Sequence, residues 1–125
     1  MKKYLGLLSI ILLLSSFRNF SGIDDVVAAM RSGNAYLLAK NFDNTVEIIM
    51  PDKSNSYSKN QAEVVLKDFF STNTVQAFAI IHKGENAGSQ YCIGNLITKT
   101  GVYRTTVYMK FKAGNSVVQE IRFEK

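Results

Sequence analysis

Residues 23–52 read IDDVVAAMRSGNAYLLAKNFDNTVEIIMPD, and the pattern of this stretch is the strongest indication of the fold. Up to Met30, apolar residues recur at spacings of three and four, which is typical of an amphipathic helix. Gly33 is suited to a left-handed helix end, and Asn34 is suited to capping a following helix. The β-branched and apolar residues 45–50 then indicate a strand. We therefore expect a helix, a tight turn, a second helix and a strand.

A third helix and four further strands are predicted downstream. Residues 51–58 are polar and turn-forming, so we expect an exposed loop there. Ser58 can cap the third helix, and Gln61, three residues later, completes a capping-box pattern. The remaining sequence alternates strand-forming runs with turn signals, which predicts an antiparallel meander. Its strands are expected at residues 75–83, 90–99, 101–112 and 116–124. The expected class is α+β, with three helices packed on one face of a strongly curved, mainly antiparallel sheet.

Alternation in the last two strands separates an apolar face from a polar one. The apolar face of residues 101–112 should carry Tyr103, Thr105, Val107, Met109 and Phe111. In the final strand, we expect Val117, Gln119, Ile121 and Phe123 on one face, and Val118, Glu120, Arg122 and Glu124 on the other. The polar face has two interpretations. It is either a solvated surface or a subunit interface, and in the second case Tyr91, Arg104 and Tyr108 would belong to a homodimer contact, because tyrosine and arginine are favoured at interfaces.

The first 21 residues have the pattern of a secretory signal peptide. Lys2 and Lys3 precede an apolar run of about ten residues, too short for a membrane-spanning helix, which needs roughly twenty. No cysteine directly follows the run, so we expect no lipid anchor on the leader. We expect residues 1–21 to be the signal peptide and residues 22–125 to be a single exported domain, periplasmic or extracellular, that meets the membrane only through its leader.

The charge of the chain argues against nucleic acid as a partner. The whole sequence has 15 basic and 10 acidic residues, a net charge of +5. Removing Lys2, Lys3 and Arg18 with the leader would leave 12 basic and 10 acidic residues, a net charge of +2. A nearly neutral domain with dispersed charge lacks the basic stripe of a nucleic-acid-binding surface.

Metal binding and a disulfide are disfavoured by the residue counts. Cys92 is the only cysteine and His82 the only histidine, so neither an internal disulfide nor a typical zinc site can form. Cys92 lies in an apparent strand, where a cysteine is usually a small buried hydrophobic residue. We expect no cofactor.

The S-G-N turn at residues 32–34, F-D-N-T-V-E at 42–47, H-K-G at 82–84 and the ending Q-E-I-R-F-E-K at 119–125 carry a family resemblance. Together with the order of helices and strands, they resemble the nuclear transport factor two-like superfamily, whose fold is a cystatin-like cone. The pattern also looks like a family of small exported Bacteroidetes proteins of unknown function. The superfamily includes ketosteroid isomerases, polyketide cyclases of the SnoaL type and many binding modules.

The resemblance also indicates which two residues of this chain would have to act in ketosteroid isomerisation. In ketosteroid isomerases of this fold, an oxyanion-donating tyrosine lies seven residues before the turn glycine, where this chain has Val26. Their general-base aspartate follows the V-E pair of the first strand, where this chain has Ile48. Neither side chain can donate a hydrogen bond or remove a proton, which disfavours this activity. A shift of one residue in the alignment would place Glu47 there, although alternation predicts that Glu47 faces solvent.

Two classes of function remain open. The favoured one is a non-enzymatic binding module that takes a hydrophobic small molecule or a peptide in an apolar pocket. Its expected lining is Phe70, Phe78, Ile80, Tyr103, Val107 and Phe111, unless these side chains simply fill the core. The alternative is an isomerase, cyclase or hydrolase in the same cone. It would use His82, the weak catalytic candidate, with Glu47 or a tyrosine.

Overall fold

The computed structural model describes residues 22–125. The predicted signal peptide, residues 1–21, lies outside the described residues. The elements in chain order are α2 (Gly22–Ser32), α3 (Ala35–Ala39), β1 (Phe42–Ile49), β2 (Ser54–Ser58), α4 (Lys59–Thr72), β3 (Val75–Asn86), β4 (Ser89–Thr98), β5 (Gly101–Lys112) and β6 (Asn115–Glu124). Within the described range, no helix has the length and apolar character that crossing a membrane requires.

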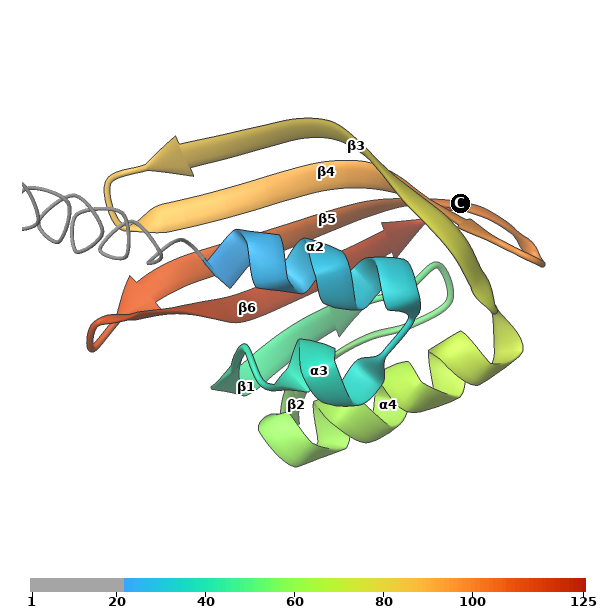
Figure 1. The fold of residues 1–125 in the computed structure, drawn as a ribbon. Helices are drawn as coiled ribbons and strands as arrows, with labels where there is room; N and C mark the ends of the chain where they lie inside the picture. Colours follow the sequence, from blue (N-terminus) through green and yellow to red (C-terminus); the bar gives the residue numbers. More distant parts are fainter. Residues whose placement is uncertain (1–21) are drawn as a thin grey trace, which may run out of the picture.

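The strands form one six-stranded sheet in the order β2-β1-β6-β5-β4-β3. Neighbouring strands are antiparallel except β1 and β6, which run parallel. Figure 1 shows the sheet curving around one side of the molecule, with α2, α3 and α4 on its concave face. The predicted α+β class is therefore confirmed.

The helix ends follow from local sequence. Gly33 has a φ of +62°, and the amides of Gly33 and Asn34 donate to the carbonyls of Met30 and Ala29, which closes α2. The side chain of Asn34 accepts a hydrogen bond from the Leu37 amide and caps α3. Ser58 does the same for α4 by accepting from the amide of Gln61 at 3.3 Å. These caps confirm the predicted end of α2 and the predicted starts of α3 and α4.

The core lies between the helices and the concave face of the sheet. Fully burying an aliphatic or aromatic side chain stabilises the fold by about 1.5–3 kcal/mol, so this layer supplies most of the driving force. The largest fully buried side chains are Phe123, Met30, Leu38, Ile48, Leu66, Leu96, Met109 and Ile121.

The structure corrects the expected loop at residues 51–58. Ser54–Ser58 is strand β2, which pairs antiparallel with β1 and places Tyr57 opposite Val46. β2 lies at the edge of the sheet, is largely exposed and is stabilised by its backbone pairing with β1. Its sequence therefore shows no alternation of apolar and polar residues. The gap predicted between the strands at residues 75–83 and 90–99 is also shorter than expected. β3 continues to Asn86 and β4 begins at Ser89, so only a short turn joins them.

A β-bulge corrects the predicted faces of the last strand. Tyr108 pairs with Glu120, whereas the next residue, Met109, pairs with Val118, so Gln119 is the extra residue on β6. The bulge reverses the alternation on its N-terminal side. Val118 is therefore fully buried, like Ile121 and Phe123, and Val117 is only partly buried.

Candidate ligand-binding site

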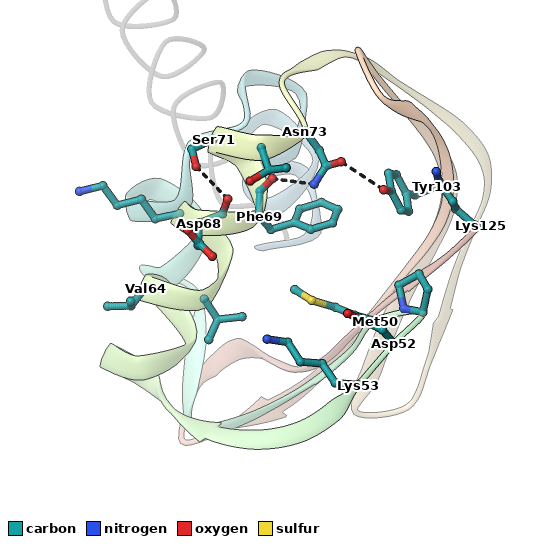
Figure 2. Close-up of a pocket in the computed structure, with 14 residues that line it drawn as sticks. Met50, Asp52, Lys53, Val64, Asp68, Phe69, Ser71, Asn73, Tyr103 and Lys125 are labelled. Carbon is teal, nitrogen blue, oxygen red and sulfur yellow. Dashed lines mark hydrogen bonds between the residues drawn. The ribbon is translucent and has the colours of Figure 1, made fainter.

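A pocket of about 800 Å³ opens between α4, the turn joining β1 to β2, and the ends of β5 and β6 (Figure 2). It is an open hollow rather than an enclosed cavity. Of its fourteen lining residues, five are charged, three are neutral and polar, and six, counting Tyr103, are apolar. The lining residues are Met50, Pro51, Asp52, Lys53, Val64, Val65, Lys67, Asp68, Phe69, Ser71, Thr72, Asn73, Tyr103 and Lys125.

An aromatic cluster forms one wall of the pocket. The ring of Phe69 stacks on that of Phe123 with centroids 4.5 Å apart, and meets Tyr103 edge-on at 5.3 Å. Each aromatic pair at such a separation stabilises the fold by about 0.5–1.5 kcal/mol beyond the contribution of its buried surface. Phe69 comes from α4 and Tyr103 from β5, so this wall ties the helix to the sheet.

Asn73, just after the C-terminus of α4, fixes the position of that wall. Its backbone amide and its side-chain Nδ2 both donate to the carbonyl of Phe69, at 2.8 and 2.9 Å. Its Oδ1 accepts from the hydroxyls of Tyr103, at 3.1 Å, and Thr100. Asn73 is buried, and all these bonds are internal to the fold. The Tyr103 hydroxyl therefore has its proton engaged and is held against the end of α4.

The tight turn between β1 and β2 forms the opposite side of the pocket. The Met50 amide donates to the Lys53 carbonyl at 2.8 Å, and the Lys53 amide donates back to Met50 at 3.4 Å. This reciprocal pair fixes both residues at the pocket mouth. Figure 2 shows the thioether of Met50 and the amine of Lys53 directed toward the open space beside Phe69.

The charged lining residues are three lysines and two aspartates, a local net charge of +1. Lys125 lies over the face of Tyr103, with Nζ 5.2 Å from the ring centroid. Within residues 22–125, neither Lys53 nor Lys125 forms a salt bridge. Figure 2 shows the Lys53 amine in the open space of the pocket and the Lys125 amine on the other side of the Tyr103 ring.

The predicted lining residues divide among several environments. Tyr103 lines the pocket, whereas Phe70, Phe78 and Val107 are buried in the core. Ile80 is partly buried and packs against that core.

The expectation for Phe111 needs a correction, because its side chain is 57% exposed and far from the pocket lining. β5 runs beyond the region that the helices cover. Met109, beside the first residue of α2, is its last buried position.

His82 and Glu47 are not brought together. Both side chains are exposed. His82 lies on the edge strand β3 and Glu47 on β1, so three strands separate them. Four strand spacings of about 4.8 Å amount to roughly 19 Å along the sheet. The His82 ring instead neighbours that of Tyr91, with centroids 5.5 Å apart. These two residues cannot form the acid–base pair that the enzyme hypothesis invoked.

The two positions that carry catalytic groups in ketosteroid isomerases are core positions in this chain. Val26 and Ile48 are 0% and 1% exposed. Within the described part of the chain, no three His, Cys, Asp or Glu side chains gather where they could hold a metal ion. Cys92 is fully buried, and burial raises the pKa of its thiol to about 11.

Comparison with known proteins identifies the family. Residues 23–124 match the family described as a domain of unknown function, DUF4783. The chain belongs to the DUF4783 family. A family member from Bacteroides uniformis is 30% identical with a TM-score of 0.80, covering 82% of this chain and 94% of its own. A second, from Bacteroides fragilis, is 30% identical with a TM-score of 0.77, covering 81% and 95%.

A more distant likeness supports the fold of this DUF4783 domain. A nuclear transport factor two-like protein of unknown function from Cytophaga hutchinsonii is 6% identical with a TM-score of 0.61, covering 86% of this chain and 92% of its own. The search of curated proteins gave no match. The resemblance drawn from the sequence, to a Bacteroidetes family of unknown function with the nuclear transport factor two-like fold, is confirmed.

Tyr91, Arg104 and Tyr108 lie on the convex face of the DUF4783 sheet. Tyr91 pairs with Tyr108 across β4 and β5, and Arg104 pairs with Glu124 on β6. The Tyr91 ring covers Gly84 of β3 so closely that a Cβ there would lie 2.2 Å from the ring. Gly84 thus gives Tyr91 room to lie flat across its neighbouring strand.

Proposed function

We propose that this DUF4783 domain is an exported, non-enzymatic binding module, and that the pocket beside α4 takes a small molecule with an apolar body. Its volume of about 800 Å³ falls within the range of ligand pockets, roughly 300–1,000 Å³. The aromatic wall of Phe69 and Tyr103 supports the proposal, because aromatic and apolar side chains usually contact the body of a bound ligand.

Export is the second part of the proposal. Lys2 and Lys3 followed by a short apolar run have the pattern of a cleavable leader. Sequencing the N-terminus of the protein recovered from the periplasm or medium tests this part. A mature chain beginning near residue 22 supports export, whereas recovery of the intact chain only in the cytoplasm opposes it.

Native mass spectrometry tests binding. The protein isolated from cells should carry a retained small molecule. Met50→Trp fills the pocket mouth and should abolish the added mass. Ile49→Trp is the matched control, because the adjacent side chain of a strand points to the opposite face. A protein free of added mass that also binds no member of a lipid and aromatic library would refute the small-molecule proposal.

A second candidate function is self-association through the convex face. Val102 is 50% exposed and Tyr108 39% exposed on this face, and Ile81 of β3 is also exposed. Arg104 and Lys110 on β5 lie near acidic Glu120 and Glu124 on β6, so the face carries both signs of charge and can pair with a second copy of itself. We propose a homodimer through this surface as the alternative to a solvated face.

A further inference from the structure

We infer that the open edge of β3 pairs with β3 of a second copy of this chain, so that two six-stranded sheets join into one continuous sheet. This inference is independent of the pocket and uses a different surface from the convex face. It follows from the position of β3 in the sheet, from the direction of its free backbone groups, and from the charges of Lys83 and Glu85.

β3 is the last strand of the sheet, and its outer edge is open. It is 12 residues long, whereas β2, at the opposite edge, has 5. Figure 1 shows no described helix or strand beyond β3. Among residues 22–125, the only side chain that bonds to the β3 backbone is that of Arg31, whose Nε donates to the Phe78 carbonyl at 3.2 Å. A row of unpaired N–H and C=O groups is a template for pairing with another strand.

The backbone groups of Lys83 and Glu85 point toward this open edge. In an antiparallel ladder, alternate residues direct their N–H and C=O toward the partner strand, and the residues between them direct these groups away. The Phe78 carbonyl bonds to Arg31 and is therefore directed away from β4. On β4, the partners of Lys83 and Glu85 lie an even number of residues from the partner of Phe78. Lys83 and Glu85 therefore also direct their N–H and C=O outward.

Lys83 and Glu85 make this edge complementary in charge to a second copy of itself. Both side chains are exposed, and Glu85 forms no salt bridge within the described residues. When two copies pair antiparallel around Gly84, Lys83 lies directly opposite the partner's Glu85. Two-fold symmetry forms this contact twice. Opposite charges at directly opposite positions stabilise a strand pair.

The same two charges disfavour the neighbouring registers. The next registers with the same hydrogen-bond pattern are shifted by two residues. A shift in one direction places Lys83 opposite the partner's Lys83, and a shift in the other places Glu85 opposite the partner's Glu85. Like charges at directly opposite positions destabilise the pair. A lysine on an edge strand also discourages pairing with unrelated strands, so these charges limit the edge to one register with its own copy.

Sedimentation velocity of charge variants measures this pairing. The parent protein and every variant carry Tyr108→Glu, so that association through the convex face does not contribute. The interface is small, so we expect a weak dimer that forms in the millimolar range, above the concentrations used for light scattering. Lys83→Glu should weaken the dimer roughly tenfold or more, because two opposite-charge pairs, each worth up to about fivefold, become two like-charge pairs. Lys83→Glu/Glu85→Lys exchanges the charges and should restore the dissociation constant to within about threefold.

Asp24→Asn is the matched control. Lys83 forms a salt bridge with Asp24 at 3.4 Å, so Lys83→Glu also removes a contact within its own chain. Both partners of this salt bridge are exposed, and its loss alone should leave the dissociation constant within about twofold. Equal weakening by Asp24→Asn and by Lys83→Glu would overturn the pairing of Lys83 with the partner's Glu85.

Disulfide cross-linking tests the register. Residues that exchange hydrogen bonds across an antiparallel pair have Cα atoms about 5.5 Å apart, within the disulfide range of roughly 4.4–6.8 Å. Mild oxidation of a mixture of Lys83→Cys and Glu85→Cys chains should therefore link one variant to the other in preference to itself. Cys92 is buried and stays free.

The outcomes decide the inference. A dimer that Lys83→Glu weakens and the charge exchange restores, together with preferred linkage between the two cysteine variants, supports the pairing of β3 with its own copy. The inference is overturned by a parent protein that stays monomeric throughout the millimolar range. It is equally overturned by a charge exchange that restores nothing, or by cysteine variants that each link to themselves as readily as to one another.

Discussion

Asn73 Oδ1 accepts the hydroxyl proton of Tyr103 at 3.1 Å and so links the end of α4 to the middle of the sheet. The two residues are 30 positions apart in the sequence and both are buried. The bond fixes the ring that forms the pocket wall, so stability and ligand binding depend on the same contact.

Asn73→Ala should therefore destabilise the domain. The substitution leaves the buried hydroxyl of Tyr103 without its acceptor and removes a bond to the Phe69 carbonyl, which costs about 1–3 kcal/mol. Tyr103→Phe removes only one donor and should cost about 1 kcal/mol. Urea denaturation followed by circular dichroism measures both. Equal stability of Asn73→Ala and the wild type would show that the bond contributes nothing.

Asp43 should make the stability depend on acid. Its carboxylate accepts a hydrogen bond from Gln119, another from the Asn44 amide and a third from Lys112, and these bonds, with the Gln119 bond first, lower its pKa below the ordinary value. The stabilisation is present above the unfolded pKa of about 4 and is lost as pH falls through the lower folded pKa.

Asp43→Asn isolates this contribution. The difference in the free energy of unfolding between wild type and variant should be constant above about pH 5 and shrink at lower pH. Denaturant titrations from neutral pH to about pH 2 provide the measurement. A difference that grows as pH falls would have the wrong sign for a carboxylate with a lowered pKa.

Cys92 should be chemically silent in the folded protein. Its thiol is fully buried, and burial raises its pKa to about 11. At pH 8 a disulfide reagent such as dithionitrobenzoate should react only after denaturant is added. The unfolded thiol ionises near pH 8.5, so this group also contributes stability that is lost as pH rises from there through the folded pKa. Rapid labelling of the native protein would contradict the burial.

Tyr108→Glu tests the convex-face homodimer. A carboxylate at position 108 would lie opposite Glu120, its cross-strand partner, and burying this like-charged pair between two copies would oppose association, so light scattering should report a monomer. Tyr36→Glu, the same substitution at an exposed position of α3, is the control for the change of charge and should leave the oligomeric state unaltered. An unchanged dimer in Tyr108→Glu would place the interface elsewhere.

Local chemistry made much of the fold predictable. Gly33, Asn34 and Ser58 act through their own backbone conformation or through amides three residues away, so the helix ends can be read from short stretches. β2 and the bulge at Gln119 depend instead on strand pairing. A polar segment such as Ser54–Ser58 acquires its structure from β1, and the period-two pattern gives no sign of an inserted residue.

The pocket was less predictable for a related reason. Tyr103 follows from apolar alternation, whereas Phe69 was not among the predicted lining residues. Met50, Lys53 and Asn73 come from a turn and a helix end that only the tertiary structure brings together. The placement of Phe111 was wrong because alternation identifies a face of the sheet but not where the helices stop covering it.

The most direct measurement is a crystal structure of the protein purified from its own host without added ligand. We expect continuous electron density for a small molecule in contact with Phe69, Tyr103 and Met50. A pocket filled only with ordered water, in a protein whose mass spectrum shows no retained compound, would contradict the proposal that this pocket binds a small molecule.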